Sequence, residues 1–185
     1  LWMAAGGDTA GAVTDPDMVA LFDDFLGKEE SVTMGLSPRV ARPYQYVLRD
    51  TEQRGLCLRD GHLVATALQG ANSAQEEPIS VVPNRHLERQ RCPLIVGIRG
   101  GTQALSCGTG PEPHLHLQDV GLLELFKADQ DTAMPFTFYK TFGGSTHTFE
   151  AAAFPGRFLS TAPGPGEELA LAPAPNATAF YLHRR

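Results

Sequence analysis

Few residues of this chain have the types and spacing of a catalytic or metal-binding site. His114 and His116 are the best metal candidates, because alternate positions on a strand place both imidazoles on one face. A zinc site needs one or two further ligands, which His62, His147 or Cys107 could supply only if the tertiary fold brings them close. An exposed strand face is the simpler interpretation, so we expect no metal site here.

The local motifs of common enzymes are also missing. The sequence contains no GxSxG turn, no HExxH helix, no phosphate-binding loop and no GxGxxG fingerprint. The paired carboxylates Glu76 and Glu77 stand beside a proline, as solvated loop charges do. The chain has three cysteines, Cys57, Cys92 and Cys107. They form no CxxC pair that would suggest a disulfide, and no His/Asn arrangement accompanies them that would suggest a nucleophile. We therefore expect a protein that binds a partner rather than an enzyme, and one that needs no cofactor.

One segment concentrates basic side chains in an otherwise acidic chain. It lies between the apolar runs 79–82 and 94–96, so we expect an exposed loop. Ordinary surface charge is one interpretation. A binding loop is the other, since arginine is enriched at protein interfaces. The basic residues of this segment are Arg85, His86, Arg89 and Arg91. A second candidate loop is 140–145, where we expect Phe142 at the tip of a hairpin.

Short alternating runs from residue 44 onward predict β-strands separated by turns. Gly (19) and Pro (14) are abundant among 185 residues, as expected for many turns. A short helix within 120–127, capped by Asp119, is the one predicted interruption. The pattern fits an all-β sandwich, barrel or β-trefoil. The predicted strands are 44–49, 55–59, 62–66, 79–83, 94–99, 103–107, 114–118, 136–140, 145–150, 157–160, 169–171 and 179–183.

Charge and hydropathy exclude some partners. The net charge of −6 disfavours nucleic-acid binding. No apolar run is long enough for a membrane-spanning helix, so we expect no membrane insertion. The first residues lack the basic start and the sustained apolar stretch of a secretory signal.

The chain divides near residue 42 into an acidic leader, 1–42, and a domain, 43–185. The leader carries seven acidic and three basic residues, a net charge of −4. Within it, Asp15 and Pro16 begin a predicted amphipathic helix that Gly27 ends. The helix either docks on the domain or belongs to a removable or partner-binding segment. Residues 37–43, which include Arg39 and Arg42, are typical of an exposed, cleavable linker.

The segment 149–161, FEAAAFPGRFLST, resembles the signature of the interleukin-1 cytokine family. Other stretches resemble the family in the same order along the chain, among them 56–65, 79–85 and 135–139. The resemblance covers residues 44–183, with Arg157 standing where the family usually has an aromatic residue. The signature residues, which we expect to be structural, are Phe149, Pro155, Gly156, Phe158, Leu159 and Thr161.

The resemblance implies a twelve-stranded β-trefoil and a monomeric ligand of an interleukin-1-type receptor, released from the cytoplasm without a signal peptide. Within the family the likeness is greatest to the interleukin-36 branch, with the interleukin-38 branch second. It implies trimming around 37–42, a few residues ahead of a first-strand motif that ends in Asp50. It favours an antagonist over an agonist and adds Arg49 and Ala179 to the receptor-contact candidates. A lectin-like trefoil is the remote alternative.

Overall fold

The computed structural model describes residues 16–27, 42–68, 70–143, 145–161, 167–173 and 179–185. These residues form twelve strands, as the alternating runs predict. The strands are β1 (Tyr44–Asp50), β2 (Gly55–Arg59), β3 (His62–Thr66), β4 (Ile79–Pro83), β5 (Pro93–Ile98), β6 (Gln103–Ser106), β7 (His116–Gln118), β8 (Thr137–Gly143), β9 (Thr146–Ala151), β10 (Arg157–Thr161), β11 (Glu167–Pro173) and β12 (Phe180–Arg184).

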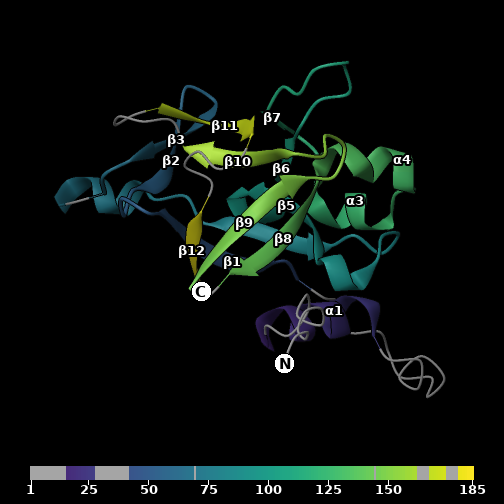
Figure 1. The fold of residues 1–185 in the computed structure, drawn as a ribbon. Coiled ribbons are helices and arrows are strands. Elements are labelled where there is room, and N and C mark those ends of the chain that lie inside the picture. The colour runs from purple at the N-terminus through teal and green to yellow at the C-terminus, as the bar shows by residue number, and fades with distance from the viewer. Residues whose placement is uncertain (1–15, 28–41, 69, 144, 162–166, 174–178) are drawn as a thin grey trace, which may run out of the picture.

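Six strands close into a barrel, each pairing antiparallel with the next in the order β1, β12, β9, β8, β5, β4 and back to β1. Closure leaves the barrel without a free edge. Strict alternation of buried and half-buried residues in β1 and β9 gives each strand one inward and one outward face. Figure 1 shows the barrel strands crossing at the centre of the molecule.

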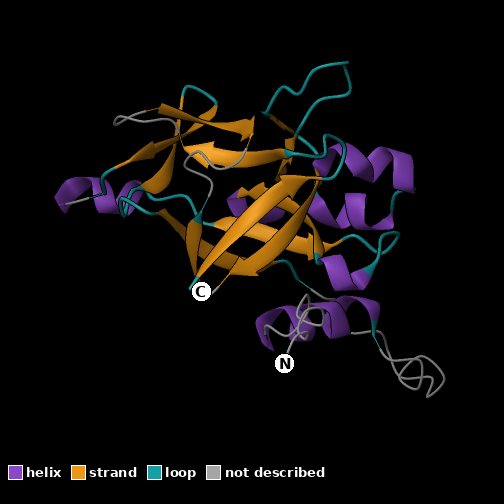
Figure 2. Ribbon diagram, in the orientation of Figure 1, coloured by secondary structure: helices purple, strands orange, loops and turns teal. Residues whose placement is uncertain are grey.

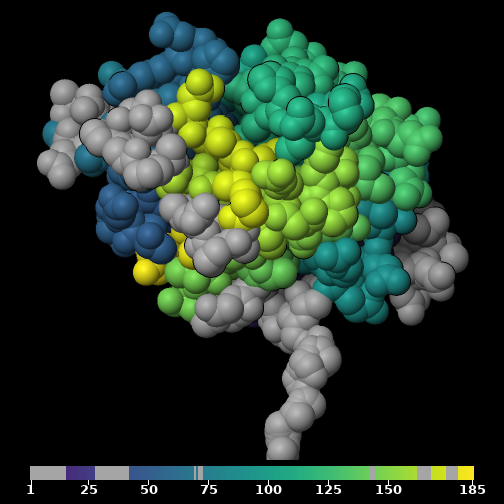
Figure 3. Space-filling view, turned by 45° about the horizontal axis from the view of Figure 1, so that its top comes forward, coloured from purple at the N-terminus to yellow at the C-terminus, as the bar shows by residue number. Residues whose placement is uncertain are grey.

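Three hairpins, β2–β3, β6–β7 and β10–β11, lie at one end of the barrel. β11 also pairs with β3, which joins two of the hairpins. A six-stranded barrel with three hairpins at one end is a β-trefoil, so the pairing decides among the three architectures that the pattern allowed. Figure 3 turns the hairpin end toward the viewer, with the teal residues before β7 beside the yellow-green and yellow strands.

Helix α1 (Pro16–Leu26) lies at the opposite end of the barrel (Figure 1). Its bounds match the sequence prediction. Pro16 starts it, and Gly27 ends it with φ 69°, its N–H donating to the carbonyl O of Asp23 at 2.8 Å. Figure 2 shows the other helices at the periphery of the strands. Among the described residues, no helix has the length and apolar character that crossing a bilayer requires.

The helical interruption of the domain differs from the prediction. Helix α3 (Leu122–Lys127) begins after Gly121 and has no side-chain cap. The Asp119 carboxylate accepts a hydrogen bond from Gln103 Nε2 at 2.6 Å instead. A second helix, α4 (Gln130–Ala133), follows and was not predicted. Short 3₁₀ turns occupy Gly70–Gln75, Arg89–Arg91, Arg99–Gly101 and Met134–Phe136.

The family-signature residues are part of the barrel core or its turns. Phe149 and Leu159 are buried, and Phe158 is half-buried. Pro155 and Gly156 make the turn before β10, where Gly156 has φ 88°. Thr161 is buried and donates a hydrogen bond to Asp50 Oδ2 at 3.0 Å. All three cysteines lie in the described part of the chain, where each is a buried thiol outside any disulfide bond.

Candidate functional site

The basic segment found in the sequence is a loop between β4 and β5, residues 84–92, which we call the arginine loop. Its base is held by Asn84, whose side chain is buried. Asn84 Nδ2 donates to Thr137 Oγ1 at 2.9 Å, and its Oδ1 accepts from the backbone N–H of His86 at 2.8 Å. The backbone N–H of Asn84 donates to the Pro93 carbonyl at 2.9 Å. The loop therefore leaves the barrel from a fixed base.

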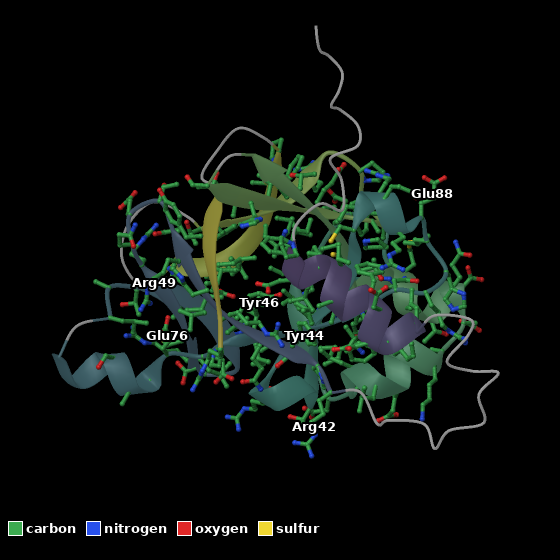
Figure 4. All side chains as sticks on the ribbon, turned by 90° about the horizontal axis from the view of Figure 1, so that it is seen from below. Arg42, Tyr44, Tyr46, Arg49, Glu76 and Glu88 are labelled. Carbon is green, nitrogen blue, oxygen red and sulfur yellow. The ribbon has the colours of Figure 1, made fainter. Side chains whose placement is uncertain are left out.

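The first two basic residues of the arginine loop lie against the end of α3. Arg85 Nη2 is 3.4 Å from the carbonyl O of Lys127, and His86 Nε2 is 2.8 Å from the carbonyl O of Ala128. These carbonyls are the negative end of the helix, which favours cationic neighbours. Both side chains are exposed, and Glu88 projects outward farther along the loop (Figure 4).

The last basic residue of the loop lies over the barrel wall. The Arg91 guanidinium lies 3.7 Å from the centroid of the Tyr139 ring, and its Nη2 is 3.6 Å from Glu150 Oε1. Tyr139 and Glu150 are directly paired residues of β8 and β9. This cation–π and ionic contact fixes an exposed positive charge on the wall, an arrangement that suits protein recognition.

The outward faces of β8, β9, β12 and β1 continue from Arg91 along the barrel wall. Thr141 and Thr148 are paired across β8 and β9 with their hydroxyls hydrogen-bonded, and Arg49 is paired with Tyr181 across β1 and β12. We call these outward-facing residues the outer strip: Tyr139, Thr141, Thr148, Glu150, Tyr181 and Arg49. All six are half-buried or exposed. Tyr139 and Glu150 were not singled out from the sequence, since only strand pairing brings them beneath Arg91.

Arg49, predicted as a contact residue, is held by an ion pair. Its guanidinium meets both carboxylate oxygens of Glu76, with Nη2 at 3.2 Å from Oε1 (Figure 4). Gly55 makes room for this pair, because a Cβ there would lie 2.1 Å from Arg49 Nη1. Glu76 is therefore not the solvated loop charge expected from sequence. Arg49 is 26% exposed and offers only part of its surface to a partner.

Asp50, predicted as the end of a processing motif, is a buried structural carboxylate. It accepts hydrogen bonds from the backbone N–H of Glu52 and of Arg54, from Arg54 Nε and from Thr161 Oγ1, at 2.8 to 3.0 Å. Of the predicted processing residues, Arg42 is exposed shortly before β1, whereas Arg39 lies outside the described residues.

Two further candidates lie near the β1 end of the outer strip. The prediction that Phe142 stands at a hairpin tip is wrong, because its backbone is in β8 and pairs with His147. His147 in turn pairs with Phe180, the residue after Ala179. Ala179 is half-buried, and residues 174–178, which precede it, lie outside the described residues.

Arg89 differs from the other arginines of the loop because it contacts α1. Its Nη2 is 2.8 Å from Asp23 Oδ1, and its guanidinium lies 5.3 Å from the centroid of the Phe22 ring. Sequence reasoning allowed α1 to dock on the domain but named no residue that it would contact there. No local signal connects two residues 66 positions apart in the chain.

The histidines that were weighed as metal ligands stack on each other. The ring centroids of His114 and His116 are 5.2 Å apart, and His116 Nδ1 is 3.0 Å from the carbonyl O of His114. Among the described residues, no three His, Cys, Asp or Glu side chains are grouped to hold a metal ion. The candidate site is the surface made of the arginine loop and the outer strip.

Comparisons with known proteins identify the family. The family model "Interleukin-1 / 18" matches residues 68–171. The human interleukin-36 receptor antagonist protein is 40% identical over 128 residues, covering 69% of this chain and 82% of the relative. The pig interleukin-1 receptor antagonist protein is 36% identical over 167 residues, covering 86% and 90%. The structure of the pro-inflammatory cytokine interleukin-36alpha superposes with a TM-score of 0.61 at 28% identity, covering 80% of this chain and 98% of that one. This protein therefore belongs to the interleukin-1 family of cytokines.

Proposed function

We propose that this cytokine is an extracellular ligand of the interleukin-36 receptor and that it acts as an antagonist. The similarity to receptor antagonist proteins supports both parts of the proposal. The proposal includes release without a signal peptide. Three buried thiols that form no disulfide bond suit a chain that folds in a reducing compartment.

The main support for receptor binding is the geometry of the arginine loop. Asn84 fixes its base, while Arg85 and Arg91 are exposed and oriented by Lys127 and Tyr139. Rigid, outward-pointing arginines lose little side-chain entropy when a partner binds. They suit an acidic or aromatic receptor surface, and the outer strip extends the same face.

Surface plasmon resonance against the interleukin-36 receptor ectodomain tests this placement. The double variant Arg85→Glu/Arg91→Glu should weaken binding about thirtyfold or more, the scale at which interface arginines contribute. Arg89 is left unchanged because it holds α1. The matched control is Arg59→Glu/Arg99→Glu, which makes the same charge change at two exposed residues away from the loop. Equal affinities of the two double variants would refute the placement.

A reporter cell line that carries the receptor tests the antagonist assignment. The protein alone should give no signal and should suppress the response to an added agonist. The second candidate function is a pro-inflammatory agonist, supported by the structural similarity to interleukin-36alpha. Signalling by the protein alone would establish the agonist and reject the antagonist.

A further inference from the structure

Helix α1 buries one complete face in the end of the barrel. Met18, Leu21 and Phe22 follow the helical spacing of three and four residues and are 0–1% exposed. They belong to the same core cluster as Tyr44 and Tyr46 of β1. The apolar face of α1 is therefore buried as deeply as a core strand.

The polar side chains of α1 are also matched by the domain. Asp17 Oδ1 is 3.8 Å from Arg184 Nη1, and Asp23 pairs with Arg89 at 2.8 Å. Asp24 Oδ2 accepts a hydrogen bond from the Tyr44 hydroxyl. Three of the carboxylates that make the leader acidic thus meet groups of the domain.

The surface under α1 is assembled from segments far apart in the chain. Figure 4 looks onto this end of the molecule, where α1 crosses the ribbon between Tyr46 and the arginine loop that carries Glu88. The Phe25 ring meets the Phe126 ring of α3 edge-on, with centroids 5.3 Å apart. Every contact named here falls within residues 17–25, and none needs the covalent link between α1 and the domain.

We propose that this end of the barrel is a helix-binding site and that α1 is its resident ligand, which stays bound as a separate chain after the linker is cut. Trimming within 37–42 then gives a two-chain protein in which Arg89 stays covered by Asp23 and Phe22. The contacts of α1 alone carry this inference, which does not depend on which receptor is bound or on the sign of the signal.

The test uses the full chain with residues 31–36 replaced by the recognition sequence of a site-specific protease. After cleavage, native mass spectrometry and size-exclusion chromatography should find both fragments in one particle, while a denaturing gel separates them. Elution of the domain fragment without the helix fragment would overturn the proposal.

Substitutions in α1 separate specific docking from incidental association. Phe22→Ala removes a fully buried ring and should weaken retention of the cut helix roughly a hundredfold or more. Ala20→Gln changes an exposed residue of the same helix and should leave retention unchanged. Retention of the Phe22→Ala helix equal to that of Ala20→Gln would count against the site.

A second variant keeps the test decisive if Phe22→Ala impairs folding, which an unfolding curve of the uncut protein will show. Asp23→Asn keeps the shape of the side chain and removes the ion pair with Arg89. It should increase dissociation of the cut helix about twofold to fivefold at low salt, with a smaller effect at high salt. If the substituted and unsubstituted helices dissociate at the same rate, and salt does not change that rate, the Asp23–Arg89 contact is not part of the site.

Discussion

At the scale of single residues, Asp50 links the first strand to β10. Its carboxylate joins Arg54, four residues along the chain, to Thr161, which is 111 residues away. Both Asp50 and Arg54 are nearly inaccessible to water. Removing one member of such a pair leaves the other charge buried without its partner, which is strongly destabilising.

We predict that Asp50→Asn lowers the free energy of unfolding by about 3 kcal/mol, because it neutralises the buried carboxylate that pairs with the Arg54 guanidinium. Urea unfolding measures the change. Asp60→Asn is the matched control, since Asp60 is exposed in a turn at φ 50°, a conformation that Asn adopts readily. Equal midpoints for the two variants would contradict the structural role of Asp50.

Burial also determines the chemistry of a cysteine. Desolvation raises the pKa of the Cys107 thiol to about 12, so almost no thiolate is present at neutral pH. The pKa of the Cys107 thiol is therefore higher in the folded protein than in the unfolded chain. Its contribution to the free energy of unfolding is fully present below pH 9 and is lost as the pH rises toward 12.

Iodoacetamide at pH 8 should therefore leave Cys107 unmodified in the folded protein. The same reagent in guanidinium chloride should modify all three cysteines. Peptide mass spectrometry reads both results, and rapid modification of Cys107 without denaturant would show that the thiol is accessible.

At the scale of elements, α1 shows what sequence pattern can and cannot provide. Its bounds were predictable because Pro16 and Gly27 act locally on the backbone. Its position on the barrel was not predictable. It depends on contacts with Arg89 and Arg184, and the periodicity of the helix itself does not indicate which distant residues it contacts. The predicted cap at Asp119 failed for the same reason: the carboxylate accepts a hydrogen bond from Gln103 of β6, which lies 16 residues away in the chain.

The docking of α1 should weaken in strong base. Burial, followed by the hydrogen bond and charge of Asp24, raises the pKa of the Tyr44 hydroxyl above 10. A raised pKa means that this contribution to stability is present below pH 10 and is lost as the pH rises through the folded value. In Tyr44→Phe, which lacks the hydroxyl, stability should change less between pH 9 and 11. Urea unfolding across that range tests the difference, and parallel curves for the two proteins would contradict it.

At the scale of the whole molecule, the alternating runs predicted all twelve strands but not their order in the barrel. A strand can be predicted from a short segment, because its residues alternate between an inward and an outward face, as in β1. Strand order depends on pairing across the whole chain, such as β1 with β12. The resemblance to the interleukin-1 family supplied that order, whereas composition and spacing left three architectures open.

This topology predicts unequal protection of the backbone. β7 is three residues long and, among the described strands, pairs only with β6. β4 and β5 form part of the barrel wall, and each pairs with a barrel strand on both sides. Hydrogen exchange followed by mass spectrometry should find the amides of β7 exchanging at least about a hundredfold faster than those of β5. Equal protection of β5 and β7 would show that the hairpin end opens together with the barrel.

The pairing of β1 with β12 also has a practical consequence for protein engineering. Arg185 donates its backbone N–H to the carbonyl O of Gln45 at 2.9 Å, so the last residue of the sequence lies beside β1. It is also close to α1, because the neighbouring Arg184 pairs with Asp17. An affinity tag or fusion partner joined there would crowd the helix and distort measurements of its release. A fluorophore on the exposed turn at Asp60 and Gly61, at the hairpin end, reports on binding without touching α1.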